Sequence, residues 1–128
     1  LLGDQPPATL PMPAPLPAAA GEELGRRQYQ AWCASCHGSD GQGLPNTVPP
    51  LAGNSTVRSA DARNLVQVML DGLPAKRLDR DTAMAGMPSY ASLSDAELAA
   101  IANFARTQWG GRPGDVSASK VQAQRVPR

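Results

Sequence analysis

The five residues from Cys33 to His37 constrain this chain more strongly than any other stretch of its sequence. The segment reads Cys33-Ala34-Ser35-Cys36-His37, and it contains both cysteines and the only histidine of the protein. Cys-x-x-Cys-His is the attachment signature of c-type haem. The two thiols form thioether bonds to the haem vinyl groups, and the adjacent imidazole lies beneath the iron as its proximal ligand. The motif therefore predicts one covalently bound haem c.

Three other uses of the same residues explain less of the sequence. A structural zinc site needs four protein ligands, and this motif offers three. A thioredoxin-like redox pair requires a βαβ context, and no strand pattern flanks the motif. A local disulfide between Cys33 and Cys36 explains neither His37 nor the glycine-rich run that follows it. Haem attachment accounts for these features and leaves no thiol free for a disulfide.

The composition also favours a cofactor at the centre of the fold. Only 4% of the 128 residues are aromatic, which is poor for a self-sufficient core. A haem supplies a large apolar surface on which helices can pack, so we expect folding to depend on it.

Several features of the sequence indicate the cellular compartment of the protein and the kinds of partner that it can have. Thioether attachment takes place outside the cytosol, so the motif favours the bacterial periplasm. The chain begins at Leu1 without a methionine, which suggests a processed or excised chain. No apolar run approaches the length that crosses a bilayer. The formal net charge of +1 gives no indication of a nucleic-acid partner.

The chain is predicted to have one domain, over residues 21–110, flanked by two different ends. Residues 1–20 are rich in proline and alanine and are interpreted as a semi-rigid linker. That segment is either a free N-terminal tail or a tether to another domain, a subunit or a membrane complex. Residues 111–128 are interpreted as a C-terminal extension, in which residues 117–125 can form one short helix.

A first helix is predicted from Gly21 to Cys33. Glu22 and Glu23 lie where the N-terminus of a helix favours acidic side chains, and apolar side chains continue at helical spacing up to the motif. Cys33 and Cys36 are three residues apart, which is about one turn, so they face the same edge of a flat ring.

A loop and a middle helix are predicted to follow His37. The loop is rich in glycine and proline. The helix is predicted over residues 60–71, with Ser59 or Asp61 as its N-cap and Gly72 as its stop. Its inward-facing stripe consists of Leu65, Val68 and Met69. Met69 on this stripe is interpreted as a core residue rather than a ligand.

The last helix of the domain is predicted to begin at Ser94 and to end near Trp109. Ser94 and Glu97 form a capping box, and Leu93 and Leu98 are placed to form a hydrophobic staple. The buried face of this helix is predicted to consist of Leu98, Ile101, Ala102 and Ala105.

Taken together, these elements resemble class I c-type cytochromes over residues 21–110. Members of that family have an N-terminal helix ending in the Cys-x-x-Cys-His motif, a Pro-rich loop, a middle helix, a Met-bearing loop and a C-terminal helix. The resemblance implies an all-α fold, with three to five helices around one covalent haem c. It also implies that the first and last helices cross where Gly25 and Tyr29 meet Phe104.

The resemblance extends to the residues around the iron. A Pro-Pro-Leu segment ending at Leu51 is similar to the Pro-x-Leu motif of the family. This likeness implies that the Pro49 carbonyl accepts a hydrogen bond from the His37 ring, which fixes the ring orientation, and that Leu51 packs on the haem. Residues 86–90, Gly-Met-Pro-Ser-Tyr, look like the axial-methionine loop. The resemblance thus implies His37 and Met87 as the two iron ligands.

Two methionines compete for the distal position. Residues 73–92 are predicted to be irregular, and they contain both Met84 and Met87. Met87 is preferred because Pro88 stiffens the chain directly after it. Met84, three residues away, is the alternative.

Within class I, the sequence looks most like the haem domains of cytochrome subunits that serve periplasmic alcohol and sugar-acid dehydrogenases. The likeness rests on Pro-Pro-Leu-Ala-Gly-Asn ending at Asn54, Met-Pro-Ser-Tyr ending at Tyr90, and Ser-Asp-Ala-Glu-Leu followed by Trp109-Gly110. It implies one-electron transfer between a dehydrogenase and a downstream respiratory acceptor, such as an oxidase or another cytochrome. An iron with both axial positions filled by protein has no site for a substrate, so we expect an electron-transfer protein and not an enzyme.

Two other functions remain compatible with the sequence. A haem with a labile distal ligand acts as a sensor or a peroxidase-like enzyme. A haem domain fused to a larger redox enzyme serves to receive its electrons or to assemble it, a role that the Pro-rich N-terminal segment favours.

Overall fold

The computed structural model describes residues 18–77 and 83–125, with side chains from residue 21 onward. The prediction for residues 1–17, most of the Pro-rich segment, lies outside the described residues. The described part is mainly helical, which confirms the all-α class, with six helices where three to five were expected and one short hairpin. The helices are α1 (Ala18–Trp32), α2 (Ala34–His37), α3 (Ser55–Arg58), α4 (Arg63–Asp71), α5 (Asp95–Trp109) and α6 (Ala118–Gln124).

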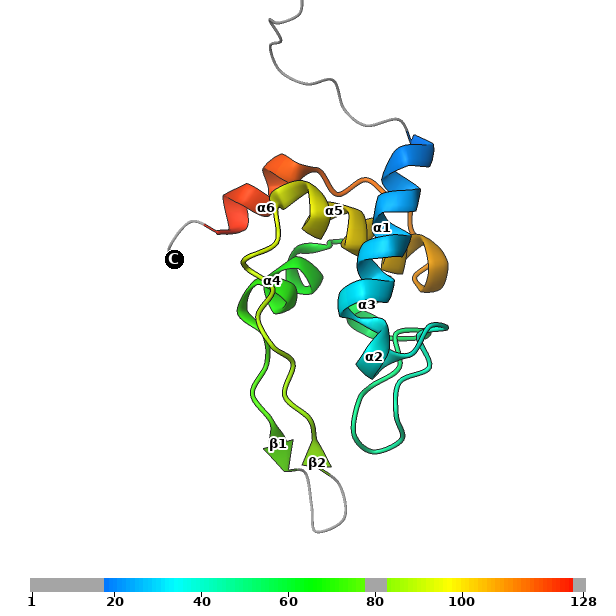
Figure 1. Cartoon of the computed structure of the whole chain (residues 1–128), viewed down its shortest axis with the longest axis vertical. Coiled ribbons are helices and arrows are strands. Elements are labelled where there is room, and N and C mark those ends of the chain that lie inside the picture. Colours follow the sequence, from blue (N-terminus) through cyan, green and yellow to red (C-terminus); the bar gives the residue numbers. More distant parts are fainter. Residues whose placement is uncertain (1–17, 78–82, 126–128) are drawn as a thin grey trace, which may run out of the picture.

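The helices α1 and α5 cross and form the centre of the fold (Figure 1). At the crossing, a Cβ atom on Gly25 would overlap the carbonyl oxygen of Ala100, so only glycine allows this approach. The Tyr29 ring lies 5.4 Å from the Phe104 ring and 5.2 Å from the Trp109 ring, measured between centroids. The crossing implied by the resemblance is therefore present, and Trp109 extends it into a three-ring cluster.

The first helix begins earlier and ends earlier than predicted. It begins at Ala18, because three alanines before Gly21 favour the helical conformation. It ends at Trp32, and Cys33 forms a turn between α1 and α2. The backbone hydrogen bond from His37 N to Cys33 O, 2.9 Å, closes the short helix α2. The Cys-x-x-Cys-His motif thus lies on this turn and on α2, not at the end of one continuous helix.

The last helix of the predicted domain, α5, has the start and the buried face that its sequence predicts. The Ser94 side chain accepts a hydrogen bond from the Glu97 backbone, and the Glu97 side chain accepts one from the Ser94 backbone. This is the predicted capping box, and it starts α5 at Asp95. All four predicted inward residues are buried, and Leu98 and Ala102 are fully so.

The region before α4 is more structured than predicted. Asn54 accepts hydrogen bonds from the backbone of Thr56 and Val57 and thereby caps the short helix α3, which the sequence prediction missed. The N-cap of α4 is Ala62, and neither Ser59 nor Asp61 as predicted, so the helix begins at Arg63 and not at residue 60. Asp61 lies one residue before the cap and accepts a hydrogen bond from the Arg63 backbone. The end of α4 is as predicted, because Gly72 follows with a φ of 72°.

A short hairpin interrupts residues 73–92, where an irregular segment was predicted. The strands β1 (Lys76–Arg77) and β2 (Ala83–Met84) pair in antiparallel fashion. A bridge between Leu73 and Met87 joins the two arms at their base. In Figure 1 the arms run side by side and project away from the helices. The prediction was wrong because two-residue strands carry no alternation of apolar and polar residues.

The C-terminal helix α6 packs on α4 and α5. Val121 is fully buried, and the Gln124 side chain donates a hydrogen bond of 2.9 Å to the Arg63 carbonyl. Arg125 forms an ion pair with Asp95, with 2.6 Å between Nε and Oδ1. The boundaries drawn from the sequence at residues 20 and 110 stay predictions.

Candidate cofactor pocket

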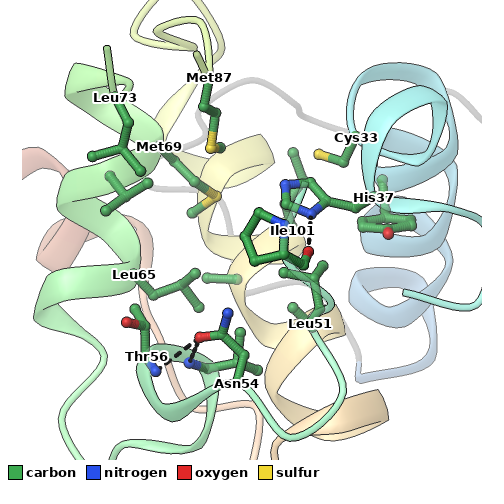
Figure 2. A pocket seen from close by; sticks show the side chains of 16 residues that line it. Cys33, His37, Leu51, Asn54, Thr56, Leu65, Met69, Leu73, Met87 and Ile101 are labelled. Atoms are coloured by element: carbon green, nitrogen blue, oxygen red, sulfur yellow. Dashed lines mark hydrogen bonds between the residues drawn. The ribbon is translucent and has the colours of Figure 1, made fainter. Parts of the chain in front are cut away.

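An apolar pocket opens between α1 and α2 on one side and α4 on the other, with α5 behind it (Figure 2). It encloses about 710 Å³, part of which is open to solvent. The side chains that line it are mostly aliphatic, among them Leu51, Leu65, Val68, Leu73 and Ile101.

Most of the residues singled out from the sequence meet in this pocket. Its lining includes Cys33, His37, Pro49, Leu51 and Met87. Cys36 is exposed and lies outside the lining. The predicted residues are therefore neighbours in space, although they span more than fifty positions of the sequence.

The two thiols differ in environment. Cys33 is buried, and this burial raises the pKa of its thiol to about 12, with a smaller contribution from Cys36. The Cys36 thiol is exposed one helical turn away. Neither thiol is in a disulfide, so both are available for thioether bonds.

His37 is held in one orientation by the backbone. Its Nδ1 atom lies 3.1 Å from the carbonyl oxygen of Pro49. Because a carbonyl oxygen only accepts, Nδ1 must carry the hydrogen, and Nε2 keeps its lone pair. Burial lowers the pKa of His37, while the hydrogen bond to Pro49 opposes that shift. The ring is thus kept in the neutral form that binds metals.

Two thioethers face His37 across the pocket. His37 enters from the side of α2, whereas Met69 and Met87 enter from the side of α4 (Figure 2). Met69 is 4% exposed, which confirms the expectation that it is a core residue, but it also lines the pocket. Met84 lies on β2 and is not among the lining residues. Of the two methionines that competed in the sequence, Met87 is therefore the one at the pocket.

The loop that carries Met87 is fastened to two helices. The Met87 backbone exchanges two hydrogen bonds with Leu73, each 2.8 Å long. The Ser89 hydroxyl donates to the Leu70 carbonyl of α4 at 2.6 Å. The Tyr90 hydroxyl donates to the Trp32 carbonyl of α1 at 2.9 Å. These bonds hold the chain at Met87 and directly after it, and so keep the thioether at the pocket.

Several lining residues were not foreseen from the sequence. Tyr29 donates from its hydroxyl to the Gly38 carbonyl at 2.6 Å and so braces the segment directly after His37. Thr56 and Val57 line the pocket from α3. The pattern Asn-Ser-Thr, typical of an N-cap, is the one signal that could have located α3 and its two lining residues.

The set of groups at the pocket suits a covalent haem. The buried and exposed thiols provide two attachment points, the neutral imidazole and the thioethers provide axial donors, and the aliphatic walls match a large apolar ring. The residues present therefore fit haem c, as the motif predicted.

The cytochrome c family model matches residues 22–109 of the chain. The chain belongs to the cytochrome c family, and its sequence and fold are those of a class I c-type cytochrome.

Three relatives illustrate the range of proteins that it resembles. The cytochrome c subunit of a quinone alcohol dehydrogenase from Gluconobacter oxydans is 40% identical over 106 residues, which cover 80% of this chain and 22% of that protein. Cytochrome c-552 from Thermus thermophilus is 38% identical over 84 residues, covering 62% of this chain and 64% of that protein. The fructose dehydrogenase cytochrome subunit of Gluconobacter japonicus is 32% identical over 106 residues, covering 80% of this chain and 22% of that protein.

The family settles the cofactor and the broad role. As a cytochrome c, the chain carries covalent haem c and transfers electrons. The chain spans about a fifth of the length of the dehydrogenase subunits that it matches. No helix in residues 18–77 or 83–125 is long and apolar enough to cross a membrane.

Proposed function

We propose that this protein transfers single electrons through a haem c attached at Cys33 and Cys36, with His37 and Met87 as the axial ligands. One observation supports this proposal most directly. The His37 imidazole, oriented by the Pro49 carbonyl, and the Met87 thioether, carried by its loop, both line the same apolar pocket. Pro49 orients the His37 ring, and Leu51 packs against the macrocycle.

The protein residues serve to hold and to shield the redox centre. The haem supplies the one-electron couple when bound. The aliphatic side chains exclude water, and the imidazole and thioether stay in place whether or not the electron is present, so little rearrangement accompanies transfer. A soft thioether opposite an imidazole favours the reduced form more than a second nitrogen ligand does.

The loop that carries Met87 favours a fixed distal ligand over a labile one. A sensor or peroxidase-like role requires Met87 to leave the pocket. Displacement of the whole loop would break the backbone bonds of Met87 to Leu73 and the side-chain bonds from Ser89 and Tyr90. Each such bond contributes about 1 kcal/mol to stability, so the structure supports electron transfer without catalysis.

The relatives support a dehydrogenase as the electron donor. The two dehydrogenase subunits each cover 80% of this chain, against 62% for cytochrome c-552, and their names assign them to alcohol and fructose dehydrogenases. We infer that the chain receives electrons from a periplasmic dehydrogenase and passes them to an oxidase or another cytochrome, either as a free protein or as a domain tethered to a membrane complex.

The proposed ligation can be tested with three variants of equal design. Met87→Leu, Met84→Leu and Met69→Leu each remove a thioether while nearly conserving volume. We expect only Met87→Leu to lose the weak red band of the ferric spectrum that reports iron–sulfur bonding, and only its ferrous form to bind carbon monoxide. Loss of the band in Met84→Leu or Met69→Leu, or rapid carbon monoxide binding by the unaltered protein, would contradict the proposal.

A further inference from the structure

Arg106 is the only charged side chain that is buried within the described residues. It lies on α5 and is 2% exposed. The preceding residue, Ala105, lines the pocket, and so does Ala102, which lies about one helical turn before Arg106. A guanidinium group stays protonated under all ordinary conditions. A permanent positive charge is therefore buried behind the pocket wall.

No carboxylate neutralises this charge within residues 18–77 and 83–125. Arg106 donates from one terminal nitrogen to the Ser59 carbonyl at 2.7 Å and from the other to the Ala60 carbonyl at 3.4 Å. Its Nε atom has no hydrogen-bond partner. Arg125 differs, because its guanidinium forms an ion pair with Asp95. Carbonyl dipoles solvate the Arg106 cation but do not cancel its charge.

The position of this cation connects it to the haem pocket. Ser59 and Ala60 follow directly after α3, whose Thr56 and Val57 line the pocket. Arg106 thus binds the segment that directly follows α3, and both α3 and α5 contribute residues to the pocket lining. Charges interact more strongly across the low-dielectric protein interior than across water, and dissolved salt screens them less.

We propose that Arg106 raises the reduction potential of the haem through its positive charge, which no protein carboxylate in residues 18–77 and 83–125 pairs with. Reduction adds one electron, without a proton, to a centre near a fixed cation, so the cation favours the reduced form. Arg106 is not a ligand of the iron in this proposal. The inference requires the haem of the cytochrome c family in this pocket, and it does not depend on Met87 being the distal ligand.

The rival explanation is that Arg106 merely joins α5 to the turn after α3. Two substitutions separate charge from shape. Arg106→Lys keeps the charge but loses the pair of guanidinium hydrogen bonds to the Ser59 and Ala60 carbonyls. Arg106→Met removes the charge and keeps much of the apolar part of the side chain. The readout is the ratio of ferrous to ferric protein at a fixed solution potential, for which a tenfold change corresponds to 59 mV.

We expect Arg106→Met to lower this ratio by roughly three- to tenfold, and Arg106→Lys to stay within about twofold of the unaltered protein. Arg112→Gln is the matched control, because Arg112 also donates to a carbonyl in this region, that of Arg58, but is exposed. It should leave the ratio nearly unchanged. Equal ratios in the Lys and Met variants, or no fall in the Met variant, would overturn the proposal.

A second pair of variants applies even where the Arg106 variants fail to fold. Ala60 is exposed, and its carbonyl accepts from Arg106. Ala60→Asp adds a carboxylate on the residue whose carbonyl accepts from Arg106, and Ala60→Asn adds the same shape without charge. We expect the ratio to fall in Ala60→Asp only, and an equal effect of both variants would refute the role of charge. The absorption spectrum recorded in the same titration reports ligation separately, so a failure of the Met87 assignment is distinguishable.

Discussion

The two walls of the pocket are built in different ways. The proximal wall, made of Cys33, His37 and Pro49, comes mainly from one five-residue motif. The Pro49 carbonyl, twelve residues away, supports the His37 ring, and the Tyr29 hydroxyl braces the adjacent Gly38. The distal wall, made of Met69, Leu73 and Met87, is assembled from α4 and a loop that long-range hydrogen bonds fasten to α1 and α4. Haem attachment should therefore depend on local sequence, whereas distal ligation should depend on tertiary structure.

Loss of the two thiols should have the largest effect. We expect the double variant Cys33→Ala/Cys36→Ala to lose all covalently bound haem and most of its helical structure, because the pocket lining then lacks the surface on which it packs. Haem staining after denaturing electrophoresis and far-ultraviolet circular dichroism measure both effects. Ser35→Ala, at an exposed position between the thiols, serves as the control. Covalent haem that persists in the double variant would contradict the attachment site.

The helix crossing should affect stability without affecting ligation. A methyl group on Gly25 collides with the backbone of Ala100, so we expect Gly25→Ala to lower the free energy of unfolding by about 1–3 kcal/mol. A methyl group on Gly21 meets no atom within 4 Å, so Gly21→Ala should stabilise α1 by about 0.5–1 kcal/mol. Denaturant titration of both holo-proteins provides the comparison. Equal effects of the two substitutions would show that the close approach of α1 and α5 is wrong.

Two tyrosine hydroxyls allow the walls to be weakened one at a time. Tyr90 donates to Trp32 and holds the distal loop, whereas Tyr29 donates to Gly38 beside the proximal motif. Burial raises the pKa of Tyr29, so its hydroxyl remains a donor. We expect Tyr90→Phe and Tyr29→Phe each to cost about 1 kcal/mol of stability.

These two variants should nevertheless differ in their distal chemistry. Tyr90→Phe should speed carbon monoxide binding to the ferrous protein, because the Met87 loop opens more often, and Tyr29→Phe should not. Stopped-flow mixing with carbon monoxide measures this difference. If carbon monoxide binding were faster in Tyr29→Phe alone, the assignment of Tyr90 to the distal wall and of Tyr29 to the proximal wall would be wrong.

Added salt should have the smallest effect. Residues 21–110 carry eight basic and nine acidic side chains, and Lys76 is their only lysine. Exposed residues such as Leu44 and Pro45 are apolar, so we expect partner docking to involve little long-range steering. Electron transfer with the physiological partner should change by less than about tenfold between low and moderate ionic strength. A fall of several orders of magnitude would instead indicate docking through charge.

The same contrast explains what the sequence could predict. The Cys-x-x-Cys-His motif and the Ser94–Glu97 capping box are local patterns, and the structure has the turn and the helix that they require. The close approach of His37 to Pro49 followed from the family resemblance and not from periodicity. Local chemistry and family resemblance were therefore sufficient for the proximal wall and for α5.

The features that the sequence did not predict depend on contacts between distant segments. The helix α3 is only four residues long, and its Asn54 cap is too short a signal to stand out. The pairing of β1 with β2 involves two residues on each strand. The dual position of Met69, in the core and at the pocket, depends on how α4 packs against α5. The strand pairing and the dual position of Met69 follow only from the assembled fold, whereas the Asn-Ser-Thr pattern was a weak local signal for α3.

The most direct test of the account is the proton NMR spectrum of the ferrous protein. The methyl group of an iron-bound methionine lies over the macrocycle, whose ring current shifts its resonance far upfield. We predict one such methyl resonance, which is lost in Met87→Leu and kept in Met84→Leu and Met69→Leu. An upfield methyl that survives Met87→Leu and disappears in Met69→Leu would place the distal ligand on α4 and contradict the account.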